Sequence, residues 1–283
     1  MDGVPILMLF LLIISRMKKL NKATKAIIRI IRNPWLLNNV LDDDQHWMEY
    51  VARHHGFKNA LPVITPESLF GDFTETVSPY ASLDGSSLPT DLALLKKLAR
   101  FFPDCTYFEI GTWRGESVAN VAAVARECYT LNLSDEEMKS MGLDQRYIDL
   151  HRHFSKDLKN VTHLQGNSNS FDFAGLGKKF DLVFIDGDHH YRTVKNDTEK
   201  VFRHLVHDHT IIVWHDYAYN PEKIRYEVMA GILDGCPEQY RQQIYHMANT
   251  MCAVFLLIKP GTRPFESPQT PDGYFEVQIK KSY

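Results

Sequence analysis

The chain has 283 residues, of which 44% are hydrophobic and 24% charged, so it can bury a substantial core. Its four cysteines are scattered without Cys-x-x-Cys spacing, which excludes a zinc knuckle or a dense disulfide framework and favours a reducing, cytoplasmic compartment. The formal charge of −3 combines +6 in residues 1–32 with −9 in the remaining 251 residues, so we expect no nucleic-acid partner for the main domain.

Residues 4–14 form an apolar run of 11 residues, short of the ~20 that a membrane-spanning helix needs. Positive charges follow this run and no small-residue cleavage site appears, which argues against a signal peptide. Residues 16–32 are basic, and apolar residues recur there at helical spacing: Leu20, Ala23, Ile27 and Ile31. This pattern is typical of peripheral contact with an anionic membrane surface at the inner face. A translation start at Met17 and a helix covering the catalytic domain are the alternatives.

We expect four regions along the chain. Residues 1–60 form a basic and amphipathic helical extension, with a break at Asn33-Pro34, an apolar element at 35–41 and a helix from Trp47 to His55. Residues 61–89 are rich in Pro, Gly, Ser and Asp and predict an irregular connection over the mouth of the site. A catalytic domain over 90–258 begins with an amphipathic helix at 91–102, and residues 259–283 form a surface tail.

The segment 107–117 predicts a strand, a glycine-rich turn and a helix start, which together form a nucleotide-cofactor pocket. Gly111 and Gly115 allow the backbone to approach a ligand, and the small, apolar helix over 117–125 packs closely. A carboxylate, Glu109, stands where the dinucleotide Gly-x-Gly-x-x-Gly pattern has its first glycine. It would repel a pyrophosphate and favour a cationic ligand.

After this turn, apolar segments at 128–133, 161–165, 180–185 and 210–214 alternate with helical segments at 135–156, 191–207 and 221–233. Such alternation predicts a parallel sheet with helices on both faces. The last two apolar segments, 242–247 and 251–258, are too close in sequence for a parallel crossover and predict an antiparallel hairpin.

Residues 108–125, 180–191 and 213–217 resemble the class I S-adenosylmethionine-dependent methyltransferases. They are most similar to the branch with an Asp-Gly-x-His-x-Tyr stretch after the fourth strand and a His-Asp pair after the fifth. The resemblance covers roughly residues 90–258 and implies a Rossmann-like α/β fold with a seven-stranded, mostly parallel sheet ending in an antiparallel hairpin. It also implies S-adenosyl-L-methionine as the cofactor.

Ligands of such sheets lie beyond the carboxyl ends of the strands, so the resemblance assigns cofactor contacts to those ends. From the first end to the fourth, the implied contacts are Glu109, Gly111, Thr112, Trp113, Gly115, Ser117, Asn132, Asn167, Ser168 and Asp186. Glu109 as a turn cap, Asn132 as a helix cap and Asn167-Ser168 as an ordinary polar turn are the alternatives. Asn132 also departs from the family, which usually places an acid there for the ribose hydroxyls.

His189, His215 and Asp216 are the candidate catalytic residues, because the fourth and fifth strand ends lie side by side. A histidine titrates near neutral pH and accepts an alcohol proton as a methyl group moves, so we predict His189 as the base, with His215 second. A divalent cation, Mg²⁺ or Mn²⁺, is the rival use of this region, with Asp188, His215 and Asp216 as its ligands. The imidazole favours an ion softer than Mg²⁺.

The sequence thus predicts a methyltransferase for the oxygen of a small-molecule or glycan-type acceptor. An NAD-linked oxidoreductase is an alternative, opposed by the absent dinucleotide pattern and by the terminal hairpin. A non-catalytic membrane-surface or partner-binding protein that kept the fold is the other. Oligomeric state is not readable from the sequence.

Overall fold

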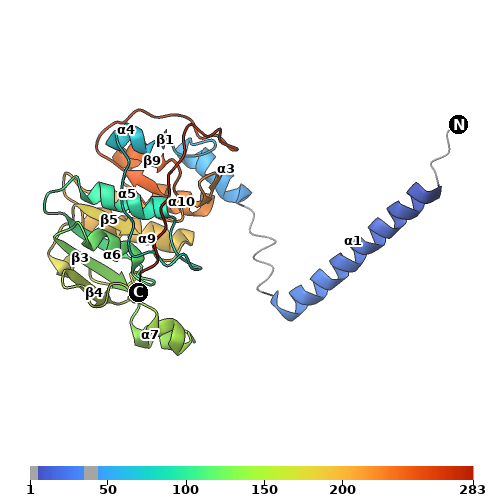
Figure 1. The fold of residues 1–283 in the computed structure, drawn as a ribbon, viewed down its shortest axis with the longest axis horizontal. Helices are drawn as coiled ribbons and strands as arrows, with labels where there is room; N and C mark the ends of the chain where they lie inside the picture. Colours follow the sequence, from blue (N-terminus) through green and yellow to red (C-terminus); the bar gives the residue numbers. More distant parts are fainter. Residues whose placement is uncertain (1–5, 35–43, 283) are drawn as a thin grey trace. The chain divides into compact units, whose positions relative to one another are not determined.

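The computed structural model describes residues 6–34 and 44–282, with side chains from residue 17 onward in these ranges (Figure 1). The chain divides into two compact units, Met1–His46 and Trp47–Tyr283. The apolar element predicted at 35–41 lies outside the described residues.

In the described part of the first unit, the long helix α1 (Ile6–Arg32) joins the apolar run and the basic segment of the sequence. It ends just before Asn33-Pro34, as predicted, because proline disfavours helical backbone in the residue that precedes it. Among the described residues, no helix is long and apolar enough to cross a membrane.

The second unit is built around a sheet with the strand order β1-β9-β10-β6-β5-β2-β3-β4. Its strands are β1 (Val63–Ile64), β2 (Thr106–Ile110), β3 (Glu127–Asn132), β4 (Val161–Gln165), β5 (Leu182–Ile185), β6 (Ile211–Trp214), β9 (Ile244–Met247) and β10 (Ala253–Phe255). Strands β2 to β6 pair in parallel, whereas β10 pairs antiparallel with both β6 and β9. The predicted α/β sheet with a C-terminal antiparallel hairpin is therefore confirmed.

In the residues that the structure describes, the sheet has eight strands rather than the predicted seven. The extra strand, β1, comes from the segment expected to be an irregular connection, and it pairs in parallel with β9. Val63 also exchanges two backbone hydrogen bonds with Arg263 of the tail, at 2.8 and 2.9 Å. The two-residue strand has too little sequence to show a period, but it gives the edge of β9 the backbone partners that an edge strand otherwise lacks.

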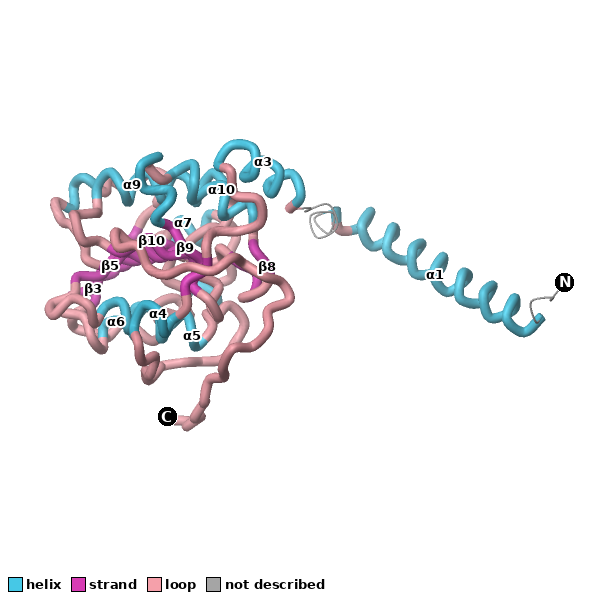
Figure 2. Tube along the Cα trace, turned by 90° about the horizontal axis from the view of Figure 1, so that it is seen from above, coloured by secondary structure: helices cyan, strands magenta, loops and turns pink. Residues whose placement is uncertain are grey.

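Helices cover both faces of this sheet (Figure 2). On one face lie α3 (Gln45–His55), α9 (Tyr191–His204) and α10 (Tyr226–Gly235), and on the other lie α4 (Pro66–Phe70), α5 (Pro89–Ala99) and α6 (Glu116–Ala122). Two apolar clusters match this division, one including Phe108, Val183 and Met229, the other including Leu94, Tyr107 and Val118. Alternate residues of β2 thus point into different layers, as the two-residue period of a strand requires.

Two predicted helices differ in the structure: one is interrupted and the other begins later than expected. The segment expected as one helix at 135–156 contains α7 (Asp135–Ser140) and α8 (Gln145–Asp149), separated at Gly142, whose φ is +82°. The helix expected from Pro221 begins only at Tyr226, because β7 (Ala218–Asn220) and β8 (Lys223–Ile224) form a small antiparallel hairpin before it. The 3₁₀ helices named in the described residues are Ala174–Leu176 and Glu238–Gln243.

Candidate active site

The glycine turn follows β2 and is held against the ends of the two neighbouring strands. The Gly111 amide donates to the Leu131 carbonyl at 2.9 Å, and φ of Gly111 is +95°. A Cβ at this position would lie 1.9 Å from the carbonyl oxygen of Asp186. Glycine is therefore required here because the turn approaches the end of β5 closely.

Gly115 immediately precedes α6 with φ +78°. A Cβ on it would lie 2.3 Å from the Ser155 hydroxyl, so this glycine lets the segment after α8 reach the helix start. Ser117 lies in the first turn of α6 and is 9% exposed. Both glycines of the motif thus serve close contacts within the protein itself.

Glu109 is fully buried at the end of β2. One carboxylate oxygen accepts a 2.6 Å hydrogen bond from the Tyr107 hydroxyl, and the other has no partner among the described residues. Burial raises the pKa of Glu109 to about 8. The buried Thr112 hydroxyl likewise lacks a partner, so two polar groups beside the turn are available to a ligand.

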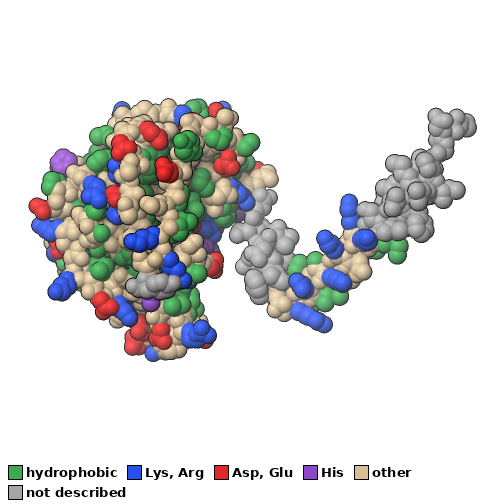
Figure 3. Space-filling view, in the orientation of Figure 1, with side chains coloured by type: hydrophobic (Ala, Val, Ile, Leu, Met, Phe, Trp, Pro, Cys, Tyr) green, Lys and Arg blue, Asp and Glu red, His purple; other side chains and the backbone are tan. Residues whose placement is uncertain are grey.

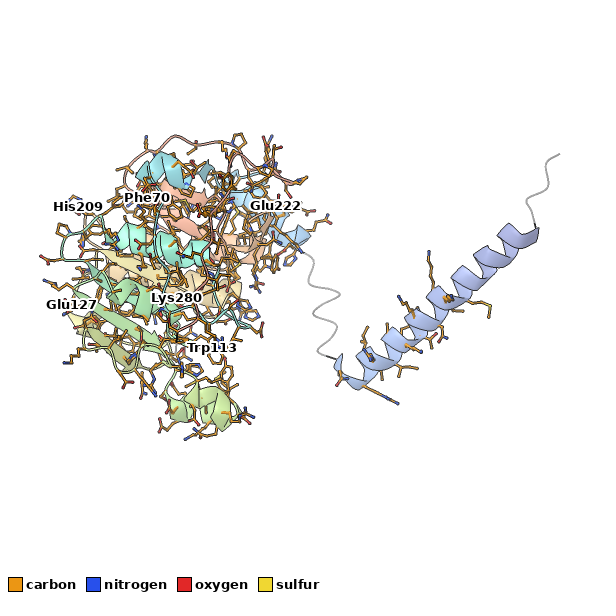
Figure 4. The ribbon with its side chains drawn as sticks, in the orientation of Figure 1. Phe70, Trp113, Glu127, His209, Glu222 and Lys280 are labelled. Atoms are coloured by element: carbon orange, nitrogen blue, oxygen red, sulfur yellow. The ribbon has the colours of Figure 1, made fainter. Side chains whose placement is uncertain are left out.

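Part of the connection over 61–89 lies across the start of α6. Glu116 accepts hydrogen bonds from the Ala81 amide at 2.5 Å and the Ser86 hydroxyl at 2.8 Å, and Asn120 bonds Ser78 and Pro79. Trp113, labelled in Figure 4, stacks on Tyr147 of α8 with ring centroids 4.3 Å apart. The turn is therefore bordered by the 78–86 segment and by α8.

The predicted contacts at the second and third strand ends have protein partners. The Asn132 amide oxygen accepts from the Thr112 backbone at 3.3 Å, whereas Ser134 caps α7. Asn132 thus hydrogen-bonds the glycine turn, and it does not cap α7. Asn167 accepts from the Asn169 amide at 2.9 Å in a local turn, and the Ser168 carbonyl accepts from Lys200 at 2.7 Å.

A cluster of charged side chains occupies the ends of β5 and β6. His215 Nδ1 lies 3.0 Å from Asp186 Oδ1 and 3.6 Å from Asp216 Oδ1, while its Nε2 lies 3.1 Å from Asp91 Oδ2. Asp91, in the first turn of α5, is fully buried and also accepts backbone hydrogen bonds from Leu88 and Met251. Both ring nitrogens of His215 are therefore engaged by carboxylates.

The surroundings of His215 and His189 favour different charge states of the two side chains. Burial opposes a charge on His215, but Asp186, Asp216 and Asp91 outweigh it and raise its pKa well above the ordinary value. Burial, and then the charge of Arg225, lower the pKa of His189. At neutral pH, His215 is a cation and His189 a neutral imidazole, the form that can accept a proton.

His189 stands next to this cluster with its side chain 41% exposed, and its Nδ1 lies 3.9 Å from Asp216 Oδ2. Asp216 adopts φ +53°, an uncommon backbone conformation outside glycine, at the residue that contacts both histidines. A hollow of ≈ 10 Å³, about the space one water molecule needs, is bounded by Asp186, His189 and His215 among others.

Asp188 does not join the cluster. Its carboxylate contacts the His190 ring at 2.5 Å and accepts from the Thr193 hydroxyl at 2.9 Å. In the described residues, two groups bring potential metal-ligating atoms within 4.8 Å of one another: Asp91, His215 and Cys252, and Asp186, His215 and Asp216. The second group contains two of the three predicted metal ligands, with Asp186 in place of Asp188.

The sequence reasoning missed Asp91, Ser155 and Arg225. Asp91 is an acid near the start of a predicted helix, a position typical of a capping role, and its second role toward His215 involves a residue 124 positions away. Ser155 lies inside a segment predicted as a continuous helix, and Arg225 lies inside one predicted to begin at Pro221. No local pattern distinguishes these three residues.

The strand order, the glycine turn after β2 and the acidic strand ends are those expected of an α/β domain that resembles the class I methyltransferases. Residues 108–217 match the family model described as "Methyltransferase domain". This match supports the resemblance seen in the sequence, the transferase class and S-adenosylmethionine as the cofactor. No curated protein sequence matches the chain.

Solved structures with similar folds include a Klebsiella pneumoniae protein provisionally described as an O-methyltransferase, at 16% identity and a TM-score of 0.42, covering 62% of this chain and 83% of that one. CalS10, an amino pentose methyltransferase from Micromonospora echinaspora, has 19% identity and a TM-score of 0.35, covering 50% of this chain and 55% of its own. DesVI from Streptomyces venezuelae has 15% identity and a TM-score of 0.32, covering 46% of this chain and 49% of its own. The chain spans about half the length of the last two proteins.

The residues beside the glycine turn fit this cofactor. S-adenosylmethionine carries an ammonium and a sulfonium charge, and one oxygen of Glu109 and the hydroxyl of Thr112 are buried groups without a hydrogen-bond partner in the described part of the chain. A buried polar group without a partner is costly, so a polar ligand at this position would stabilise both.

Proposed function

We propose that the protein is an S-adenosylmethionine-dependent O-methyltransferase for a hydroxyl of a small-molecule or glycan-type acceptor. The observation that carries this proposal is the neutral, half-exposed His189 beside Asp216, at the same sheet edge as the glycine turn. A hydroxyl acceptor needs a base near neutral pH, and His189 has the required charge state and access.

His189 is the proposed base. Its Nδ1 faces Asp216, which leaves Nε2 to accept the acceptor's hydroxyl proton. The resulting imidazolium lies beside the Asp216 carboxylate, which stabilises the added positive charge. The positive charge that comes with a proton at Nε2 is thus balanced by Asp216 within the site.

His215 has a different proposed role. Since its two nitrogens already lie within 3.1 Å of Asp186 and Asp91, it has no free nitrogen to accept a further proton. It acts as a fixed cation that holds the carboxylates of Asp186 and Asp216 at the strand ends. Asp91 orients the ring from the opposite side.

Glu109 and Thr112 would hold the polar end of the cofactor, with Gly111 and Asn132 shaping the turn. The cofactor supplies an electrophilic methyl group on a sulfonium. For such a displacement, the chief task of the protein is alignment of the two reactants, and rigid strand ends serve it well.

A metal-assisted site is the second candidate mechanism, favoured by the convergence of Asp186, His215 and Asp216. The contact between Asp91 and Nε2 of His215 matches the arrangement in which a carboxylate orients a metal-binding imidazole. The mixed nitrogen and oxygen ligands favour Mn²⁺ over Mg²⁺. Loss of turnover in EDTA, with recovery in MnCl₂, would favour this mechanism over the metal-free one.

We also propose that α1 contacts an anionic membrane surface. Its described part exposes the apolar side chains of Met17, Leu20, Ile27 and Ile31, at 57–72% of their areas. Figure 3 shows Lys and Arg side chains interleaved with hydrophobic ones along the part of this helix that is drawn in colour. Exposed apolar groups and a basic face are the combination that binds a lipid surface.

The base is tested by His189→Ala, with His190→Ala as the matched control because His190 is a neighbouring, more exposed histidine paired with Asp188. Methyl transfer from labelled S-adenosylmethionine is measured against a panel of phenols, alcohols and sugars. We expect His189→Ala to lower turnover by about 10²–10⁴-fold while the affinity for S-adenosylhomocysteine stays within a few fold. Retained turnover in His189→Ala would reject His189 as the base.

A further inference from the structure

The hairpin β7–β8 brings two cations to the rim of the proposed acceptor site. It leaves the end of β6 after Tyr217 and returns at Arg225, whose amide donates to the Tyr217 carbonyl at 2.9 Å. This bond holds Arg225, the residue immediately before α10, beside Tyr217, which follows Asp216 in the chain. The position of its backbone is set by this bond and by the hairpin.

Arg225 and Lys223 share one aromatic ring. The guanidinium carbon of Arg225 lies 5.0 Å from the Tyr219 ring centroid, and the Lys223 ammonium lies 4.8 Å from it. Tyr219 is 40% exposed and Lys223 is exposed, whereas Arg225 is half-buried beneath the rim. An aromatic face attracts each cation, but it does not neutralise either of them.

Neither cation has a carboxylate partner within ion-pairing distance among the described residues. Glu222 accepts from the Gln269 amide at 2.7 Å, and Glu227 accepts from the Tyr191 amide at 3.0 Å. Asp216, on which the charge of Arg225 also acts, lies beside His215 and His189. The Nε of Arg225 is buried and has no hydrogen-bond acceptor among the described residues. The planar donors of a guanidinium suit a carboxylate or a phosphate, so an oxyanion is the external partner whose chemistry fits this side chain.

We propose that Arg225 and Lys223 form an acceptor subsite for an oxyanion, a carboxylate or a phosphate carried by the molecule whose hydroxyl is methylated. The subsite rests on the proposed methyltransferase function and narrows its acceptor to an anionic hydroxyl compound. Arg225 binds the oxyanion through its planar donors, and Lys223 adds a second positive charge. Because the Arg225 amide is bonded to Tyr217, the residue that follows Asp216, the anchored acceptor presents its hydroxyl toward His189.

The test compares matched probes on the full chain saturated with S-adenosylhomocysteine. One pair is 3,4-dihydroxybenzoate and 3,4-dihydroxybenzamide, and the other is glucose 6-phosphate and glucose, so each pair differs in the anionic group. Affinities are measured by isothermal titration calorimetry for the wild type, Arg225→Gln, Arg225→Lys and Lys223→Gln. The matched control is Arg203→Gln, because Arg203 is exposed and lies near the C-terminal end of α9, away from the end that follows His189.

We expect the anionic member of at least one pair to bind about tenfold more tightly than its neutral partner. That preference should vanish in Arg225→Gln, weaken in Lys223→Gln, survive in part in Arg225→Lys and stay unchanged in Arg203→Gln. The pair that shows it distinguishes a carboxylate from a phosphate. Equal binding or no binding by both pairs, or the same preference in a folded Arg225→Gln, would overturn the subsite. Failure to bind S-adenosylhomocysteine would instead reject the proposed function.

Discussion

Two buried ionisable side chains of this site have opposite surroundings. The hydroxyls of Tyr107 and Ser117 favour the ionised form of Glu109, but burial outweighs them and favours its neutral form. His215 is surrounded by Asp186, Asp216 and Asp91, so its charged form is favoured despite burial. The site therefore holds a proton on Glu109 that a cationic ligand should displace.

Proton release on cofactor binding follows from the pKa of about 8 for Glu109. Below this pH the free protein carries a neutral Glu109, and an ammonium group beside it favours the ionised form. The affinity for S-adenosylhomocysteine should therefore rise with pH from about 5 to 8 and level off above, with a proton released at pH 7. Calorimetry in buffers of different ionisation enthalpy measures that proton.

Glu109→Gln is the matched variant, because it keeps the shape of the side chain and removes the titration. It should bind more weakly, with an affinity that does not change over this pH range. A wild-type affinity that is flat between pH 5 and 8 would contradict a cofactor contact at Glu109.

At this scale the sequence predicted that His189, His215, Asp188 and Asp216 converge, because parallel strands end at a common edge. The structure brings His189, His215 and Asp216 together with Asp186, whereas Asp188 contacts His190. The sequence did not predict Asp91, since the contact with His215 depends on how α5 lies against the sheet. Contacts between residues far apart in sequence leave no local pattern.

The elements were predictable where a period or a turn signal was strong. The alternation of apolar and helical segments predicted the parallel strands, and the short spacing of the last two strands predicted the hairpin. The two-residue strand β1 and the β7–β8 hairpin were missed because each is too short to show a period. Gly142 interrupted the helix expected after β3.

The contact between α9 and α10 depends on two glycines that the sequence analysis did not use. A Cβ on Gly231 would lie 2.9 Å from both the Tyr191 carbonyl and the Val194 Cβ, and one on Gly235 would lie 2.6 Å from the Lys195 carbonyl. In an open helix, Gly→Ala stabilises by up to about 1 kcal/mol. Between these helices we expect Gly231→Ala to lower the free energy of unfolding by about 1–3 kcal/mol.

Urea denaturation measures this change. Gly273→Ala is the control, since nothing lies within 4 Å of the added Cβ and its unfolding free energy should hardly change. A Gly231→Ala protein as stable as the wild type would show that the helices do not need this close approach.

At the scale of the whole molecule, the chain joins a basic helix, α1, to a catalytic unit of opposite net charge. The positive residues of α1 are worth about 1 kcal/mol each near an anionic surface, and salt screens this attraction. Membrane binding should therefore depend on the charge of α1 and not on that of the second unit.

Co-sedimentation with vesicles of phosphatidylcholine and 30% phosphatidylserine tests this at about 0.1 M salt. Changing Lys18, Lys19, Lys22 and Lys25 together to Gln should weaken binding by about a hundredfold or more. The control changes four exposed lysines of the second unit to Gln: Lys139, Lys156, Lys159 and Lys259. The membrane assignment would be contradicted if both variants lost vesicle binding equally or if the wild type did not bind vesicles. A protein that self-associates through α1 without binding vesicles would contradict it as well.

The most direct test of the central claim is the choice of cofactor. Calorimetric titration of the full chain with S-adenosylhomocysteine and, separately, with NAD distinguishes a methyltransferase from an NAD-linked oxidoreductase on a similar fold. We predict saturable, one-to-one binding of S-adenosylhomocysteine, weakened by Glu109→Gln, and no binding of NAD. Binding of NAD without binding of S-adenosylhomocysteine would contradict the methyltransferase assignment.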